Sequence, residues 1–425
     1  MLQLYNTMSG NTEVFKPRHA DNVVRMFSCG PSIYRRPHVG NYRSFVWEDV
    51  LQRYLEYLGY QVERVLNFTD VEDKAIAEAQ EEGITLTELT DPVVKQFFED
   101  ASLLRIKLPD PIPRSSTSVD QAVKLIQVLL EKGFAYWHQN NVFYDPLKFK
   151  GFGKLSRLDM SRWPKKKRRF QRDTYPGRRW NLGDFILWHG YREGDTVFWD
   201  TEIGRGRPSW NIQDPAMVTK HLGYAIDISC GGIDNLYRHH DYNIAVIEAA
   251  SGEEFARYWI HGEHLLVNGK KMSKSLGNII YPEDLVADGH TGQHVRFYLM
   301  YRHHRKRLNF TSASFQKISN RLDILRAAFR EIVQPLPDEG NPAGSDKEPQ
   351  KLVAALAAGF ENHMNDDLDV SGAVDKLSEV LTKLVSLKQS GHLKGDDCIR
   401  IDQEMRRIDT VLQVLFNPEP YGSPR

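Results

Sequence analysis

Residues 23–67, VVRMFSCGPSIYRRPHVGNYRSFVWEDVLQRYLEYLGYQVERVLN, contain the pattern that decides the fold. The run 23–29 is apolar and β-branched and meets Gly30-Pro31, which predicts a buried strand followed by a turn. Apolar residues recur at helical spacing over 44–58, and 61–67 predicts a second strand. Strand, loop, helix and strand make a βαβ unit with parallel strands. We therefore expect an α/β fold with a Rossmann-type parallel sheet, which binds ligands at the carboxyl ends of its strands.

The rest of the chain indicates further elements around this unit. Helical patterns cover 86–104 and 118–133, and strand-like segments lie near 135, 142, 224–228 and 265–267. The stretch 149–207 is rich in Gly, Pro and Arg and is typical of an inserted subdomain. After residue 311 long helical patterns follow, interrupted by a polar linker at 336–348. We predict a catalytic domain over 1–309, with the basic insertion at about 149–207, and an all-α helical bundle over 310–425.

The composition is that of an ordinary globular protein. The chain has 425 residues, with 56 Lys+Arg against 56 Asp+Glu and 41% hydrophobic residues, which excludes disorder and bulk-charge coating of nucleic acid. The three cysteines, Cys29, Cys230 and Cys398, are too few for a disulfide scaffold. No run approaches the ~18 apolar residues of a membrane span, and the first residues do not have the pattern of a secretory signal. We expect a cytoplasmic monomer without a membrane partner.

The loop before the predicted helix has the features of a phosphate site. Residues 36–41 read RPHVGN, between a strand and the amino end of a helix, where free backbone amides attract anions. Gly40 allows the backbone to approach a nucleotide closely, and His38 can donate hydrogen bonds to phosphoryl oxygens. On its own this short pattern is weak evidence, and a histidine in a surface loop is the better default interpretation.

A second segment, Lys271-Met-Ser-Lys-Ser275, follows a predicted strand much later in the chain. Its two lysines and two serines suit the triphosphate of ATP, particularly a pyrophosphate leaving from the α-phosphorus. A solvated basic turn is the alternative. The order of the two segments fits two loops on opposite halves of one nucleotide-binding sheet.

Together, HVGN and KMSKS resemble the paired signatures of class I aminoacyl-tRNA synthetases. The segments MFSCGPSIYRRPHVGNYRSF, LEYLGYQVERVLNFTDVEDK, GRGRPSWNIQDPAM, DISCGGIDNLYRHHDYNIAVIEA and LLVNGKKMSKSLGN resemble the cysteinyl-tRNA synthetases in particular. The likeness runs from Leu4 to about Phe416. It implies that a carboxylate attacks the α-phosphorus of ATP to give an aminoacyl-adenylate and pyrophosphate, after which an acceptor displaces AMP.

The resemblance also implies residue roles. The catalytic residues would be His38, Asn41, Lys271 and Lys274, Trp210 would lie beside the substrate side chain with Cys29, and Gly231, Gly232 and Asp234 would border the adenylate. The implied set for ATP, bound with Mg²⁺, is His38, Gly40, Asn41, Gly231, Gly232, Asp234, Lys271, Met272, Ser273, Lys274 and Ser275.

The resembled family binds the substrate thiolate through a zinc ion, and this sequence departs from its ligand pattern. Two cysteines, a histidine and a glutamate of the family fall here at Cys29, Asp214, His239 and Asn243. An Asp can bind zinc, whereas a neutral Asn is a poor ligand, so the site would be weaker and less rich in sulfur. Cys230 could return a second sulfur, or could simply fill the core. Zinc and cysteine as substrate are therefore open at this point.

The acceptor is the other open question. Only NPEPYGSPR follows Phe416, so we expect the anticodon-reading module of the family to be absent. A related branch, the cysteine ligase of mycothiol synthesis, joins cysteine to a small amine. However, nine basic residues at 162–179, interleaved with aromatics, and RHHRKR at 302–307 favour tRNA. We expect a cysteine–tRNA ligase; the alternatives are a tRNA-independent ligase of a small amine and an inactive nucleic-acid-binding or regulatory paralogue.

Overall fold

A computed structural model describes residues 1–170, 172, 182–334 and 347–416. Its centre is a four-stranded parallel sheet in the order β10–β9–β3–β4. Met26 pairs with Ile228 and Val24 with Val62, so apolar side chains of neighbouring strands pack on the same faces. The strands are β3 (Val23–Ser28), β4 (Gln61–Leu66), β9 (Ile226–Gly232) and β10 (Ala256–Gly262).

Helix α1 (Val39–Tyr57) makes the crossover from β3 to β4. Its apolar side chains, including Val46, Val50 and Leu51, are fully buried, and Gly59 takes a left-handed φ of 94° just after the helix. The helix begins five residues before the predicted start at Ser44 because His38 and Asn41 cap it. The predicted βαβ unit is otherwise confirmed.

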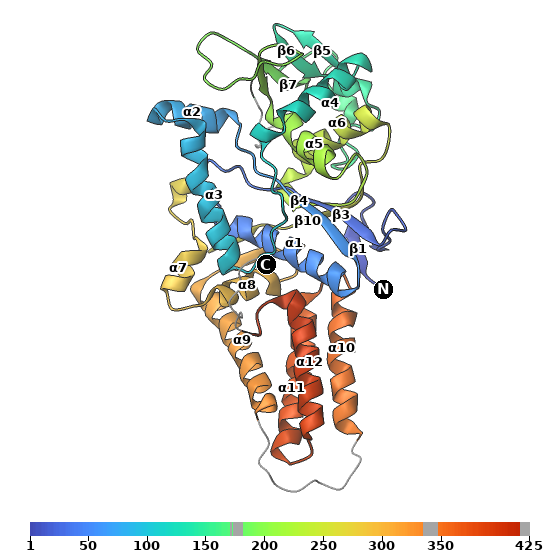
Figure 1. Ribbon diagram of the computed structural model, residues 1–425, viewed down its shortest axis with the longest axis vertical. Coiled ribbons are helices and arrows are strands. Elements are labelled where there is room, and N and C mark those ends of the chain that lie inside the picture. Colours follow the sequence, from blue (N-terminus) through green and yellow to red (C-terminus); the bar gives the residue numbers. More distant parts are fainter. Residues whose placement is uncertain (171, 173–181, 335–346, 417–425) are drawn as a thin grey trace.

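Helices and a second sheet surround the parallel strands. An antiparallel sheet in the order β5–β6–β7–β8 packs with α4 around a separate core and forms the top of the molecule in Figure 1. Its strands lie on both sides of residue 149, where the sequence places the start of the insertion. The elements are α2 (Asp73–Glu82), α3 (Leu86–Leu103), η1 (Ser115–Thr117), α4 (Val119–Glu131), β5 (Ala135–His138), β6 (Asn141–Tyr144), η2 (Pro146–Lys148), η3 (Met160–Arg162), β7 (Phe185–Gly190), β8 (Gly206–Pro208), α5 (Trp210–His221) and α6 (Asp241–Ser251).

Smaller elements complete this half of the chain. The segment 265–267, predicted as a strand, pairs within a small sheet β12–β11–β13 rather than in the parallel sheet. The elements are β1 (Gln3–Asn6), β2 (Asn11–Val14), η4 (Ile233–Asn235), η5 (Leu236–His240), β11 (Leu265–Val267), β12 (Lys270–Lys271), η6 (Lys274–Leu276), α7 (Pro282–Ala287), α8 (Gly292–Tyr301) and β13 (Leu308–Phe310).

Four helices then form a bundle that extends from the sheet domain along the long axis (Figure 1). They are α9 (Ser312–Val333), α10 (Glu348–Met364), α11 (Val370–Gln389) and α12 (Gly395–Leu412). The apolar core runs without interruption from the parallel sheet into this bundle. The predicted fold class is confirmed, while the polar linker at 336–348 lies mostly outside the described residues. Among the described helices, none combines the length and apolar character needed to cross a membrane.

Candidate active site

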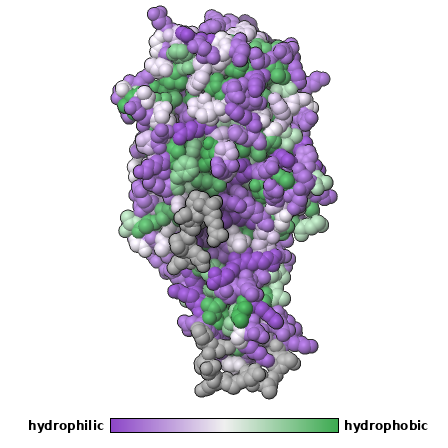
Figure 2. Space-filling model, viewed as in Figure 1, coloured by the Kyte–Doolittle hydropathy of each residue, from purple (hydrophilic) through white to green (hydrophobic). Residues whose placement is uncertain are grey.

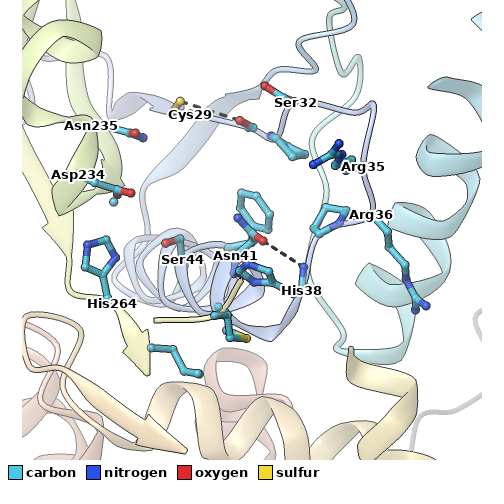
Figure 3. A pocket seen from close by; sticks show the side chains of 18 of the residues that line it. Cys29, Ser32, Arg35, Arg36, His38, Asn41, Ser44, Asp234, Asn235 and His264 are labelled. Carbon is cyan, nitrogen blue, oxygen red and sulfur yellow. Dashed lines mark hydrogen bonds between the residues drawn. The ribbon is translucent and has the colours of Figure 1, made fainter. Parts of the chain in front are cut away.

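A cavity of about 690 Å³ opens at the carboxyl ends of β3, β9 and β10. The chain leaves β3 towards β4 and leaves β9 towards β10 on the other side, so the cavity lies where the strand order reverses. Figure 3 shows its labelled side chains arranged around the amino end of α1. The predicted residues that line it are Cys29, His38, Gly40, Asn41, Trp210, Gly232, Asp234, His239, Lys271, Met272, Ser273 and Lys274.

His38 and Asn41 cap the helix that faces the cavity. The His38 Nδ1 accepts the Asn41 N–H at 3.3 Å, and the Asn41 Oδ1 accepts the His38 N–H at 3.0 Å (Figure 3). Burial, and secondarily the positive charge of Lys271, lowers the pKa of His38. A neutral imidazole whose Nδ1 accepts carries its proton on Nε2, so His38 retains a donor for an anion.

The KMSKS segment lines the cavity beside the start of this helix. The Asn278 side chain holds its turn, because Oδ1 accepts the Ser273 N–H at 2.9 Å and Nδ2 donates to the Lys271 carbonyl at 3.3 Å. Lys271 and Lys274 are exposed, and the Lys271 Nζ lies 3.8 Å from the Asp234 carboxylate. Ser275 does not line the cavity, but its hydroxyl lies 3.2 Å from that of Ser273. The two cationic side chains are therefore available to a polyanion.

Close packing explains the glycines around the cavity. A Cβ at Gly40 would lie 2.6 Å from the Met272 Cε, so the two signature segments touch at this point. Gly231 lies beside the His240 ring, and a Cβ at Gly232 would lie 2.6 Å from the Asp234 carboxylate. Gly231 does not itself line the cavity. A side chain at any of these positions would therefore collide with a neighbouring residue of the site.

At the other end of the cavity a sulfur, a nitrogen and an oxygen converge. The Cys29 Sγ lies 3.0 Å from the His239 Nε2 and 3.6 Å from the Asp214 Oδ2, which lies 2.7 Å from the same nitrogen. Asn67 fixes the other carboxylate oxygen by a 2.9 Å hydrogen bond, and the Trp210 ring stacks on His239 at 4.6 Å. Burial and the nearby Asp214 carboxylate raise the pKa of the Cys29 thiol.

These three side chains fit a zinc ion. Catalytic zinc sites use three protein ligands and keep a fourth position open, and sulfur, imidazole and carboxylate are all accepted zinc ligands. Asn243, the fourth position that the sequence indicates, is buried one helical turn after His239, and its Nδ2 has no hydrogen-bond partner among the described residues. Cys230 is completely buried within the apolar core of β9. The candidate ligands are therefore Cys29, Asp214 and His239, and the ligand atom of His240 also lies within 4.8 Å of those of Cys29 and His239.

Two further buried histidines lie behind this cluster. The His240 Nδ1 lies 2.8 Å from the His261 Nε2, and the His261 Nδ1 lies 2.8 Å from the Thr7 hydroxyl. Burial lowers the pKa of His261 to about 3, and burial with the neighbouring histidines lowers that of His240. Both rings are thus neutral at neutral pH. The pattern of the sequence did not indicate their pairing, because His261 belongs to β10, a strand that the sequence analysis does not predict.

Other cavity residues were also missed. Tyr34 and Arg36 belong to the loop that precedes α1, Thr69 follows β4, and Glu263 and His264 follow β10. Tyr34 and Arg36 could have been predicted as cavity residues, because they lie in the same loop as the HVGN segment. Thr69, Glu263 and His264 could be found only by recognising that each follows a parallel strand.

In the basic stretch of the insertion, some basic residues form ion pairs within the protein, and others are exposed to solvent. The Lys167 Nζ bonds to Asp145 at 2.8 Å and to Asp184 at 2.9 Å, whereas Lys165 and Lys166 are exposed. Trp163 is buried and so is not available to stack on bases. Residues 173–181 of this stretch, with Tyr175 and Trp180, lie outside the described residues.

The second basic segment is also partly neutralised. Arg305 pairs with Asp367 at 2.5 Å, and Arg307 pairs with Glu263 at 3.2 Å. The segment therefore holds the two halves of the molecule together through Asp367, which also accepts the Tyr5 N–H.

Comparison with known proteins places this site in a family. A family model described as the tRNA synthetases class I (C) catalytic domain matches residues 14–320. The cysteine–tRNA ligase of Chlamydia pneumoniae is 39% identical over 97% of this chain and 86% of its own length. That of Oceanobacillus iheyensis is 36% identical over 97% and 87%. The Mycobacterium tuberculosis methionyl-tRNA synthetase with methionyl-adenylate shares the fold, with a TM-score of 0.65 at 15% identity over 92% of this chain and 90% of its own.

Proposed function

The chain belongs to the class I tRNA synthetases of the cysteine type, and from this premise we propose that it activates cysteine with ATP and transfers the cysteinyl group to tRNA. The observation that carries the proposal is that both signature segments and the Cys29 cluster line one cavity. In this reaction the cysteine carboxylate attacks the α-phosphorus of ATP and pyrophosphate leaves. A hydroxyl of the tRNA then attacks the carbonyl carbon of the adenylate, and AMP leaves.

The residues at the ATP end act by position and charge. The His38 Nε2–H and the amino end of α1 face phosphate oxygens, and the backbone at Gly40 and Gly232 borders the ATP position. Lys271 and Lys274 balance the negative charge that grows on the leaving pyrophosphate. Such charge stabilisation together with orientation supplies most of the rate of phosphoryl chemistry. Mg²⁺ accompanies ATP as part of the substrate.

The residues at the other end select the side chain. Cys29, Asp214 and His239 would hold a zinc ion, and that cation would favour cysteine over serine because it prefers a sulfur ligand. Trp210 closes this end by stacking on His239 and so limits the size of the side chain that can enter. Because Asp214 replaces a sulfur ligand, we propose that this chain binds zinc less tightly than a site with two thiolates.

The relatives favour tRNA over the two alternative functions. They are named cysteine–tRNA ligases, and the likeness extends over the helical bundle as well as the catalytic domain. A ligase of a small amine would not need the exposed Lys165 and Lys166 of the insertion, and an inactive paralogue would not need two intact phosphate-binding segments. The cytoplasmic location and the monomeric state remain predictions from the sequence.

The decisive experiment is amino-acid-dependent ATP–pyrophosphate exchange with a panel of amino acids, followed by charging of tRNA. We expect exchange with cysteine alone and transfer of radiolabelled cysteine to tRNA. Exchange with serine or another amino acid would contradict the substrate assignment. Exchange with cysteine together with transfer to a small amine, and none to tRNA, would support the amide ligase instead.

A further inference from the structure

Arg36 lies between β3 and α1 and binds acids of two other elements. Its Nη2 lies 2.8 Å from one carboxylate oxygen of Asp100 in α3, and its Nε lies 3.2 Å from the other. Its Nη1 contacts the Glu283 carboxylate in the first turn of α7. Figure 3 shows the Arg36 side chain directed away from His38, so it does not point at the phosphates.

The contact with Glu283 joins the two ATP-handling segments. α7 begins seven residues after Ser275, and the Arg36 guanidinium also lies 4.6 Å above the ring of Tyr281, the residue that precedes the helix. One residue earlier, the Ile280 carbonyl accepts the Val39 N–H at 2.9 Å. The segment at the start of α1 and the chain after Lys274 are therefore fastened to each other by one backbone hydrogen bond and by the contacts of Arg36 with Tyr281 and Glu283.

The two acidic partners of Arg36 differ in how far they are buried. Asp100 is 2% exposed and also accepts the Tyr42 hydroxyl at 3.1 Å, so it anchors Arg36 firmly against α1 and α3. Glu283 is 56% exposed, and an exposed ion pair is weak and screened by salt. Arg36 is thus the fixed partner, and Glu283 is the partner that can be released when the KMSKS segment moves.

We propose that Arg36 is a positioning residue of the adenylation reaction, which holds the KMSKS segment over the α-phosphate through Glu283. This inference rests on the proposed function. When the contact is made, the ammonium groups of Lys271 and Lys274 stay near the departing pyrophosphate. When it is broken, the backbone hydrogen bond at Val39 and the stacking of Arg36 on Tyr281 remain, but the ion pair that fixes the start of α7 is lost. Because the contact affects how often the lysines are in place, its loss lowers kcat more than it raises KM for ATP.

The test compares Glu283→Gln with Glu254→Gln. Glu254 is a matched control, because it is 55% exposed and pairs with Arg18 at 3.0 Å, outside the residues that line the cavity. We expect Glu283→Gln to lower kcat of ATP–pyrophosphate exchange roughly two- to fivefold with KM for ATP within twofold and an unchanged unfolding temperature. Glu254→Gln should match the wild type. Since salt screens the pair, the difference between Glu283→Gln and wild type should shrink as KCl is raised.

A second variant removes the bridge from the other side. Arg36→Lys keeps the charge beside Asp100 but cannot reach both acids in the fixed geometry of a guanidinium, so it should show the same loss of kcat. Equal kcat values in Glu283→Gln and Glu254→Gln, or a rise of KM alone, would overturn the proposal. Failure of the wild type to activate cysteine would instead contradict the proposed substrate, and the comparison would be made with the amino acid that supports exchange.

Discussion

His38 shows how one side chain serves both the helix and the reaction. Its Nδ1 caps α1, and this contact leaves Nε2 as the protonated nitrogen on the ring of a neutral histidine. A neutral imidazole at the amino end of a helix can donate a hydrogen bond to phosphate. Because the ring carries no charge, ATP binding does not have to pay the large cost of removing an ion from water. The cations are supplied by the KMSKS segment, whose lysines are exposed before ATP binds.

Lys274→Ala tests whether the KMSKS segment supplies the cation that stabilises the leaving pyrophosphate. We expect ATP–pyrophosphate exchange to fall by about 100-fold, since one charge-stabilising donor at a reacting centre contributes on that order. Circular dichroism and the unfolding temperature should not change, because the side chain is exposed. Lys270→Ala is the control, as this neighbouring lysine is also exposed but does not line the cavity. Equal loss in both variants would show that only the total charge of the segment matters.

Asp214→Cys tests the zinc site. The variant returns a second sulfur beside Cys29 and His239, and we expect it to hold zinc about tenfold more tightly in competition with a chelator. Metal content measured after dialysis reports this without any activity assay. Cys29→Ser should lose zinc under the same conditions. If Asp214→Cys and the wild type released zinc equally, the carboxylate would not be a ligand.

Among the elements, the loop after α8 is held to α1 by stacking of aromatic rings. His304 is buried, lies 5.1 Å from the Trp47 ring in a stacked arrangement, and its Nε2 has no hydrogen-bond partner in the described part of the chain. Burial, and then the charges of His303, Arg305 and Arg43, lower its pKa well below the ordinary value. Protonation would therefore disrupt this contact.

This pKa shift predicts how stability depends on pH. Below the ordinary histidine pKa of about 6.5, the unfolded chain binds a proton at His304 that the folded chain does not, so stability is lost as pH falls. His304→Phe keeps the stacking on Trp47 and removes the proton. From pH 6.5 to 5 its free energy of unfolding, measured with urea, should fall less steeply than that of the wild type, by up to about 1.4 kcal/mol per pH unit. His392→Gln, at an exposed site, should leave the slope unchanged; a parallel slope in His304→Phe would refute the assignment.

The sequence predicted correctly the helices, strands and motifs whose residues lie close together in the chain. β3, α1 and β4 follow from periodicity within 45 residues, and the HVGN and KMSKS segments are contiguous. The end of β9 was missed because Cys-Gly-Gly lacks apolar side chains, although its backbone pairs with β10. Arg36 meets acids 64 and 247 residues away, so its role depends on the tertiary fold and could not be predicted from the sequence.

The cavity has a central place in the arrangement of the domains. The cavity lies in the sheet domain, between the β5–β8 sheet and the helical bundle, which extend in opposite directions (Figure 1). The face of the molecule in Figure 2 is largely hydrophilic, with hydrophobic side chains scattered among polar ones. With a net charge of zero, attraction of tRNA depends on local groups of lysine and arginine rather than on the overall field.

Lys165 and Lys166 are the groups by which the insertion would bind tRNA. Because each lysine that meets a phosphate releases a counterion, the double variant Lys165→Glu/Lys166→Glu should weaken tRNA binding and reduce its salt slope by roughly one unit per lysine. Filter binding at several KCl concentrations measures both effects, while exchange of pyrophosphate without tRNA should stay normal. Lys167→Glu separates contact from folding, since this lysine bonds to Asp145 and Asp184 and its reversal should lower the unfolding temperature. An unchanged slope in the double variant would make the stretch a solvated loop and leave the helical bundle as the surface that holds tRNA.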